Sequence, residues 1–330
     1  MTFSAVIYMG ETDIRTLIKP ENNPEELMYR NLSPQLLGLA ARQSELIELV
    51  LTYGFRGLDI DMSDLLNRAT SGGLDSATCY LKSGGVEIGT FDLPIDLSVP
   101  DAEFQTALEQ LPMLLELCES LKVTRAVVTL RATNEQRSFQ ENFEIHQTRL
   151  STLATKFEEH GIRIGLAFQA AHDLRDDANY EFVNTVEKLL AFQQTAGQAT
   201  GIVLDTWDWI VGGGTIEQIR ALTKDQIVAV RISDLAAGAA LESAKSTDHI
   251  LPVADGQVPI QNVLDHLKEI EYDGPLSVYA SPEAFSGFKR DKTVELIKGL
   301  HQAIENGTCP VVEEPASEEV TEDQETADAS

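Results

Sequence analysis

The chain has 330 residues, 43 % of them hydrophobic, which is enough to bury a large core. This composition excludes a chain that is disordered over its whole length. Its 53 acidic residues outnumber its 25 Lys and Arg, and the formal charge of −28 gives a surface that repels nucleic-acid phosphates and anionic lipids. We therefore expect neither a nucleic-acid partner nor a membrane partner.

The first residues and the cysteines indicate the compartment. No basic residue precedes the short apolar stretch 5–9, and acidic residues follow soon after it, which is not the pattern of a signal peptide. No apolar run approaches the roughly 18 residues that a membrane helix requires. Cys79, Cys118 and Cys309 are too few and too far apart for a disulfide framework or a thiolate zinc site. We expect a cytoplasmic protein.

Short apolar runs alternate along the chain with amphipathic helical patterns, which is typical of parallel β/α units. Residues 1–31 precede the first predicted strand and are interpreted as an N-terminal extension. The predicted strands are, in chain order, Leu36–Ala40, Gly57–Asp61, Val86–Phe91, Arg125–Leu130, Ile162–Phe168, Gly201–Trp207, Ile227–Ser233 and Pro275–Ala280. Because eight parallel strands close into a barrel, and about 270 residues is an ordinary length for one, the sequence predicts a (β/α)8 TIM barrel over residues 32–305.

The helical patterns agree with this α/β fold. Apolar residues recur every three or four positions from Phe139 to Phe157, which predicts a helix there. Thr215 and Gln218 have the spacing of a reciprocal capping pair at the start of another helix. Apolar spacing predicts a third helix over residues 260–270.

Two segments depart from the regular pattern. Pro112 lies inside the helix expected over residues 101–121 and should kink or split it, because proline lacks the backbone N–H that an inner helical turn uses. Residues 306–330 are rich in Asp and Glu, contain no aromatic residue and have little apolar content. We interpret them as an acidic disordered tail.

Several segments together resemble the xylose isomerase-like TIM barrels, a superfamily of sugar isomerases, sugar epimerases and related lyases and endonucleases. They are Tyr53–Ile60, Gly161–Leu166, Val203–Trp207, Val230–Asp234 and Tyr272–Val278, and the resemblance covers residues 32–305. It implies a site at the C-terminal ends of the barrel strands. It also implies an activity of the sugar phosphate isomerase/epimerase type, on a sugar or a sugar derivative.

The resemblance further implies a metal site, at positions where this sequence differs from the family. Family members with isomerase activity hold a divalent cation with a Glu, an Asp, a His and a Glu on strands five to eight, and the cation polarises the substrate carbonyl. The corresponding residues here are Ala167, Asp205, Arg231 and Tyr279. An arginine stays charged and cannot bind a cation, so we expect a degenerate metal site and no metal cofactor.

An alternative ligand set stays open. Asp208 could join Asp205 through a remodelled loop, and His172 or His249 could complete a new site.

Asp205 and Arg231 are the predicted catalytic residues. They end adjacent strands, six and seven, and we expect the guanidinium to supply the missing positive charge within ion-pair reach of the carboxylate. A structural salt bridge at the barrel mouth is the alternative interpretation.

Further residues near the strand ends are candidates for substrate binding, and they are Asp208, Tyr279, Arg131, Trp207 and His172. Arg131 could bind an anionic group, and Trp207 could stack on the face of a sugar. An exposed arginine and a core tryptophan are the alternative interpretations.

We therefore expect a family member that has lost the metal site and binds a small carbohydrate-like or sugar-acid ligand at the C-terminal mouth. A second hypothesis is a metal-independent isomerase, epimerase or lyase that uses Asp205 and Asp208, with Arg231 stabilising an enediolate. A third is a non-catalytic interaction scaffold. A pocket of converging polar side chains favours the first two, and a mouth closed by packing favours the third.

Overall fold

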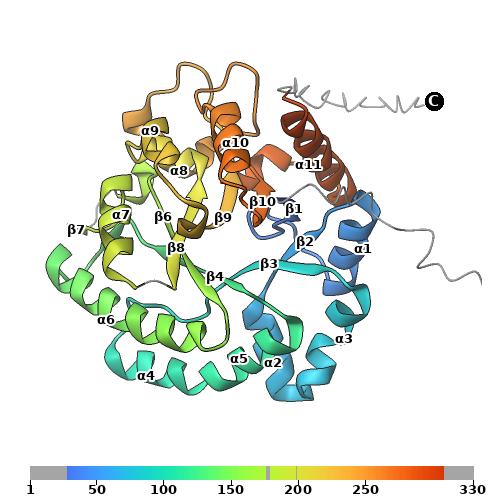
Figure 1. Ribbon diagram of the computed structural model, residues 1–330, viewed down its shortest axis with the longest axis vertical. Helices are drawn as coiled ribbons and strands as arrows, with labels where there is room; N and C mark the ends of the chain where they lie inside the picture. The colour runs from blue at the N-terminus through green and yellow to red at the C-terminus, as the bar shows by residue number, and fades with distance from the viewer. Residues whose placement is uncertain (1–27, 176–178, 198, 308–330) are drawn as a thin grey trace, which may run out of the picture.

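The computed structural model describes residues 28–175, 179–197 and 199–307. Eight of the described strands form a closed parallel barrel in the order β1–β10–β9–β8–β6–β4–β3–β2, and helices surround it (Figure 1). The barrel strands are β1 (Tyr29–Leu32), β2 (Gly57–Ile60), β3 (Glu87–Asp92), β4 (Arg125–Leu130), β6 (Arg163–Phe168), β8 (Thr200–Asp205), β9 (Ile227–Ile232) and β10 (Pro275–Val278). The predicted (β/α)8 TIM barrel is confirmed.

The first barrel strand is β1, and the predicted strand Leu36–Ala40 is wrong. Residues 34–38 form a turn, and β1 pairs with both β10 and β2 to close the barrel. The prediction followed an apolar run, whereas β1 contains Arg30 and the inward-facing Asn31. Part of the stretch 1–31 therefore belongs to the barrel. Residues 1–27 of the predicted extension, and 308–330 of the predicted tail, lie outside the described residues.

The other seven predicted strands each overlap an observed barrel strand. The described helices are α1 (Gln43–Tyr53), α2 (Met62–Gly72), α3 (Leu74–Gly84), α4 (Asp101–Glu109), α5 (Leu111–Leu121), α6 (Phe139–Glu158), α7 (Val186–Thr195), α8 (Thr206–Val211), α9 (Ile216–Arg220), α10 (Ile260–Glu269) and α11 (Arg290–Glu305). None of these described helices is both long enough and apolar enough to cross a membrane.

Proline splits one predicted helix as expected. The segment 101–121 forms α4 and α5, with Gln110 between them and Pro112 in the first turn of α5. In a first turn the missing N–H of proline costs no helical hydrogen bond. The predicted helix from Phe139 is α6, and the capping pair of Thr215 and Gln218 begins α9.

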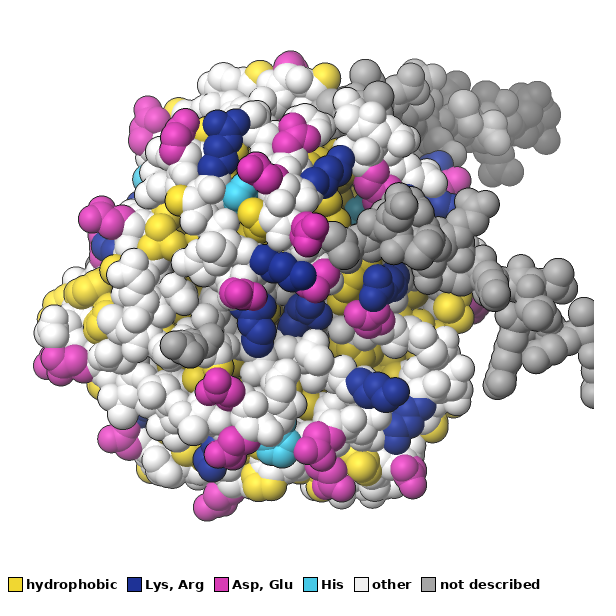
Figure 2. Space-filling model, viewed as in Figure 1, with side chains coloured by type: hydrophobic (Ala, Val, Ile, Leu, Met, Phe, Trp, Pro, Cys, Tyr) yellow, Lys and Arg dark blue, Asp and Glu magenta, His cyan; other side chains and the backbone are white. Residues whose placement is uncertain are grey.

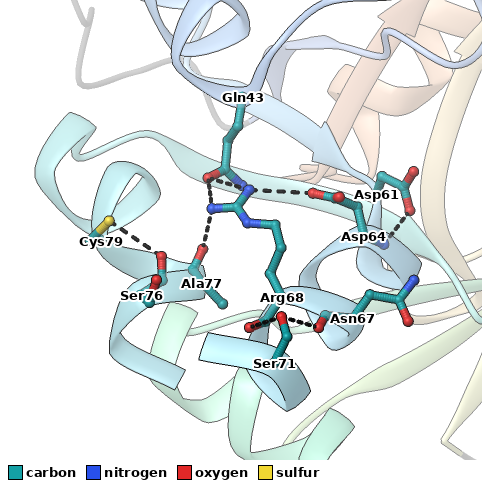
Figure 3. Close-up of polar contacts among 9 residues, drawn as sticks. All are labelled: Gln43, Asp61, Asp64, Asn67, Arg68, Ser71, Ser76, Ala77 and Cys79. Carbon is teal, nitrogen blue, oxygen red and sulfur yellow. Dashed lines mark hydrogen bonds and ion pairs between the residues drawn. The ribbon is translucent and has the colours of Figure 1, made fainter. Parts of the chain in front are cut away.

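Polar contacts join the outer helices to one another as well as to the barrel. Figure 3 shows Arg68 of α2 between α1 and α3. Its guanidinium donates to Gln43 Oε1 of α1 and, at 3.2 Å, to the carbonyl of Ala77 in α3, and it pairs with Asp64 one turn earlier in α2. These three helices therefore form one packed unit on the outside of β2 and β3.

Charged residues also gather at the ends of the barrel. Figure 2 shows Lys and Arg side chains near the centre of one face, with acidic side chains among them. At the N-terminal ends of the strands, Arg125 of β4 and Arg163 of β6 are register partners. Arg125 lies 3.9 Å from Asp273, and Arg163 donates to the backbone carbonyl of Asp225. We call this end the floor and the C-terminal end the mouth.

Candidate functional site

The inward-facing side chains divide the barrel into an apolar and a polar side. Val127, Ala167, Val203 and Ala229 form a separate cluster of buried apolar residues on β4, β6, β8 and β9. On the opposite side, Asn31 Nδ2 of β1 donates to Asp59 Oδ1 at 2.8 Å and to Ser277 Oγ at 2.9 Å. The barrel interior is therefore hydrogen-bonded along β1, β2 and β10 and apolar along β4 and β6.

Asp59 of β2 is the centre of the polar side. It is 6 % exposed, and its Oδ1 also accepts from the backbone N–H and the hydroxyl of Thr90. Burial raises the pKa of this carboxyl, while hydrogen bonds from Ser33 and Asn31 and the charge of Arg231 oppose the rise. Sequence reasoning did not single out Asp59, although a carboxylate inside a predicted strand is a usable signal.

The four positions at which the resemblance implies metal ligands are occupied here by Ala167, Asp205, Arg231 and Tyr279. Ala167 offers a methyl group, and Arg231 offers a positive charge. The hydroxyl of Tyr279 donates to Asp205 Oδ2 at 2.7 Å. Burial and the charge of Asp205 raise the pKa of Tyr279 well above its usual range, so this hydroxyl stays protonated. Of the four residues only Asp205 is an effective cation ligand.

Arg231 does not pair with Asp205, and the expected contact is wrong. The Cα atoms of the two residues are register partners on β8 and β9, yet these two described side chains form no ion pair. Arg231 Nη2 instead lies 3.8 Å from Asp92 Oδ1 of β3, which is not a neighbour of β9 in the barrel. The guanidinium therefore reaches across the mouth. Tyr279 and two backbone N–H groups donate hydrogen bonds to the carboxylate of Asp205.

Asp205, Asp208 and His249 lie together at the mouth. One ligand atom of each lies within 4.8 Å of the other two. Asp205 ends β8 and caps α8, because its Oδ1 accepts from the N–H groups of Trp207 at 3.1 Å and Asp208 at 3.3 Å. Asp208 Oδ1 accepts from the N–H of Ala170, after β6, at 2.7 Å. Burial, and then the charge of Asp205, raise the pKa of Asp208 well above its usual range.

His249 comes from the long segment between β9 and α10. Its Nδ1 lies 2.8 Å from the carbonyl of Ser246, and its ring stacks on Trp207 with centroids 3.8 Å apart. The ring of Tyr279 lies 5.4 Å from that of His249. These contacts fix the imidazole beside the two carboxylates.

Asp234 holds this long segment in place. Its carboxylate accepts from the backbone N–H groups of Leu235, Val253 and Val258 at 2.8 to 3.3 Å. Its own backbone pairs with Ile250 as an antiparallel bridge. Because Ile250 follows His249 directly, the position of the histidine depends on a carboxylate that does not itself contact it.

Trp207 packs in the core, and His172 lies in the segment that follows β6. Trp207 is fully buried, and its Nε1 donates to the carbonyl of Asp248 at 3.2 Å, so it offers no free ring face. His172 lies in a 3₁₀ turn, His172–Leu174, whose first N–H donates to the carbonyl of Ala244. It is not a member of the Asp205, Asp208 and His249 group.

A cavity of about 480 Å³ opens at the C-terminal ends of β3 and β4. Its polar lining includes Asp92, Asp96, Thr129, Arg131 and Gln169. Arg131 Nη2 lies 2.8 Å from Asp96 Oδ2, and the arginine side chain is 67 % exposed at the rim. The sequence identified Arg131 but missed the two aspartates and Gln169. Asp92 directly follows a predicted strand, and that position was the available signal.

Two arginines fix the wall of this cavity. Arg149 of α6 is buried and donates to the carbonyls of Leu97 and Val99 at 2.8 and 2.6 Å. Arg137 donates to the carbonyl of Ser98 at 2.9 Å. Three consecutive carbonyls of the segment between β3 and α4 therefore accept hydrogen bonds from arginines.

Comparison with known proteins places these features in context. The sequence model of a family described as the xylose isomerase-like TIM barrel matches residues 47–299. No curated protein matches the chain significantly. Among solved structures, a xylose isomerase domain protein from Alicyclobacillus acidocaldarius is similar, with 22 % identity and a TM-score of 0.74 over 83 % of this chain and 97 % of the other.

Two further structures have the same fold. The IolI protein, whose structure has a binding zinc atom, is 19 % identical with a TM-score of 0.68, over 83 % of this chain and 97 % of the other. A D-psicose 3-epimerase, crystallised in the presence of D-fructose, is 14 % identical with a TM-score of 0.64, over 85 % of this chain and 99 % of the other. At such identities the similarity establishes the shared barrel and not a shared substrate.

Proposed function

The chain belongs to the xylose isomerase-like TIM barrel family, and from that premise we propose that it binds a small carbohydrate-like ligand, a sugar or a sugar acid, at the mouth of its barrel. We propose also that the four-ligand metal site of the family is lost. In this family fold the mouth is where ligands bind, because the loops that follow the strands converge there.

The cavity beside β3 and β4 is the observation that carries the proposal. Its volume of about 480 Å³ suits a small molecule. Asp92 and Asp96 provide carboxylates that accept hydrogen bonds from sugar hydroxyls. Arg131 provides a donor for the carboxylate or phosphate of a sugar acid. Groups of both charges around one cavity favour a polar ligand with hydroxyls and an anionic end.

The donor chemistry supports the loss of the family's metal site. Ala167 and Tyr279 stand where the family uses carboxylates, and Arg231 stands where it uses an imidazole. The phenol O–H of Tyr279 donates a hydrogen bond to Asp205, and a protonated phenol is a poor cation ligand. A cation placed among these four groups has one carboxylate ligand and a guanidinium nearby.

The position of Arg231 argues against the metal-independent isomerase hypothesis in its simplest form. Stabilising an enediolate between Asp205 and Arg231 requires both side chains to face one substrate atom. The guanidinium instead pairs with Asp92 on the far side of the mouth. The open cavity also argues against a scaffold whose mouth is closed by packing. Ligand binding beside β3 and β4 is the function that remains.

A thermal-shift screen tests the proposal. We expect one neutral sugar or sugar acid to stabilise the protein, by about 2.7 kcal/mol at a hundredfold excess over its Kd. Arg131→Gln should weaken the binding of a sugar acid more than that of a neutral sugar. Arg56→Gln, which removes a floor arginine paired with Glu87, should leave both unchanged. A complete screen without any stabilising sugar, or equal binding by both variants and wild type, contradicts the proposal.

A further inference from the structure

We propose that Asp205, Asp208 and His249 form a binding site for one divalent transition-metal ion, shifted from the ligand set that the family uses. Only Asp205 belongs to both sets. The inference does not depend on the proposed sugar binding, because its residues lie outside those that line the cavity beside β3 and β4.

The three side chains supply suitable donor atoms at a suitable separation. Two carboxylates and an imidazole are the oxygen and nitrogen ligands that Mn²⁺, Co²⁺ and Zn²⁺ accept. Their ligand atoms lie within 4.8 Å of one another. Bonds of about 2.1 Å place tetrahedral ligands of one ion about 3.4 Å apart, so side-chain adjustments of up to about 1.4 Å close the group.

Each donor is oriented by a second hydrogen bond, which is the usual arrangement around protein-bound metals. Tyr279 Oη donates to Asp205 Oδ2 at 2.7 Å, and the N–H of Ala170 donates to Asp208 Oδ1 at 2.7 Å. His249 Nδ1 is bonded to the carbonyl of Ser246, so it carries the proton and Nε2 carries the lone pair. A carbonyl partner for Nδ1 selects the tautomer that binds a cation through Nε2.

The charges of the group also point to a cation. Asp205 and Asp208 lie close together, and neither forms an ion pair with a Lys or Arg among the described residues. The charges of Arg231 and Arg175 oppose the rise in the pKa of Asp208, but neither guanidinium forms an ion pair with it among the described residues, and Arg231 pairs with Asp92. Two carboxylates held this close together are stabilised when a cation lies between them.

The group remains accessible to an ion. Asp208 and His249 are partly exposed, while Asp205 is 6 % exposed. Three protein ligands leave at least one coordination position for water or another ligand, as in catalytic rather than structural metal sites.

A cobalt titration of the full chain tests the site directly. Protein stripped with a chelator is titrated with Co²⁺ alone, and binding is followed by calorimetry and by the visible absorption of the bound ion. We expect one saturable equivalent. Asp208→Asn and His249→Gln should each weaken binding at least tenfold, because each removes a donor while keeping the size of the side chain nearly constant.

Matched controls change the same residue types near the mouth. His172→Gln removes a histidine outside the group, and Asp61→Asn removes an exposed carboxylate after β2 while keeping an acceptor for the α2 cap. Both should bind Co²⁺ like wild type. Absence of saturable uptake by the wild type overturns the site, and so does unchanged uptake by both Asp208→Asn and His249→Gln.

If either substitution prevents folding, an NMR spectrum of the wild-type protein identifies the histidine ligand instead. The chain has 6 histidines, and in a spectrum of histidine-labelled protein the bound Co²⁺ should shift the imidazole signal of one residue strongly. Signals that broaden uniformly overturn the site. Because no sugar is present, failure here leaves the sugar-binding proposal intact, and failure of the sugar screen leaves this site intact.

Discussion

Asp273 on the floor of the barrel and the pair of Asp205 and Asp208 at its mouth are compensated in different ways. On the floor, Asp273 forms ion pairs with two basic side chains, Arg125 at 3.9 Å and Lys224 at 2.8 Å. At the mouth, Asp205 and Asp208 lie together and have no ion-pair partner among the described Lys and Arg. The chain therefore supplies close cationic side chains to this floor acid and none in ion-pair contact to the two neighbouring acids at the mouth, among the described residues.

The contrast separates stability from function in physical terms. Charges that find partners within the chain need no further component, and in parallel barrels such an arrangement at the N-terminal end serves stability. Like charges held close by backbone hydrogen bonds cost free energy that the fold alone does not recover. Sites of this kind are candidates for ligand binding.

Replacing Trp207 by Ala should cost about 3 to 5 kcal/mol of stability, because it removes a fully buried ring from the mouth. Trp209→Ala removes a second fully buried ring of α8 and should cost a similar amount. Only Trp207 stacks on His249, so only its loss should also weaken Co²⁺ binding. Urea denaturation and cobalt titration measure the two effects. Equal cobalt affinity in both variants would show that the stacking does not position His249.

Acid should destabilise the protein through two buried histidines, one near each end. Burial lowers the pKa of His146, which lines the mouth cavity, to about 4. Burial, and then the charge of Arg30, lower the pKa of His301 to about 3. Since both values lie below the unfolded value near 6.5, each neutral ring contributes stability that is present above that pH and is lost as the pH falls toward the folded value.

The size of this acid effect follows from the linkage relation. From pH 6.5 to pH 5 each ring should cost about 2 kcal/mol, at about 1.36 kcal/mol per pH unit. His301→Leu and His146→Gln should each reduce by that amount the stability lost between pH 7 and pH 5, as measured by urea denaturation. Unchanged pH profiles in both variants would mean that the rings are protonated in the folded protein.

The fold could be predicted from the sequence because it depends on repeated local patterns. Seven strands were located by apolar runs, and the split between α4 and α5 followed from Pro112. The strand that was not predicted, β1, carries the inward-facing Asn31, which donates hydrogen bonds to Asp59 and Ser277. Those partners are remote in sequence, so no local pattern reveals why a polar residue belongs there.

The site was predicted only in part because side-chain direction is not a local property. Asp205 was placed correctly at the end of its strand, and Asp208 was recognised beside it. The partner of Arg231 was wrong, because strand register sets which Cα atoms are neighbours and does not set where a long side chain reaches. His249 lies close to Asp205 and Asp208 because of the conformation of the segment that Asp234 holds by hydrogen bonds. The spacing of residues in the sequence does not predict that conformation.

Two buried tyrosines, Tyr272 on the floor and Tyr279 at the mouth, should differ in their effect on metal binding when each loses its hydroxyl. On the floor, Tyr272 Oη donates to the carbonyl of Pro275 at 3.1 Å, and at the mouth Tyr279 Oη donates to Asp205. Tyr272→Phe and Tyr279→Phe should each cost about 1 kcal/mol of stability. Tyr279→Phe should in addition change Co²⁺ affinity by about 10- to 100-fold, since it removes a partner of a proposed ligand. Equal cobalt binding by the two variants would remove Tyr279 from the site.

The smallest effect is expected at an exposed floor pair, Arg56 with Glu87, whose nitrogen and oxygen atoms lie 2.8 Å apart. Both side chains are at least 40 % exposed, so water screens their attraction. Glu87→Gln should cost less than about 1 kcal/mol, and the difference should vanish in 1 M salt, where the screening length is about 3 Å. Glu87 is the residue to change, because Arg56 also lies over the ring of Tyr29 and would lose that contact if replaced. A salt-independent loss above about 2 kcal/mol would show that the floor pairs contribute more than their exposure allows, and the contrast with the mouth would then rest on its unpaired acids alone.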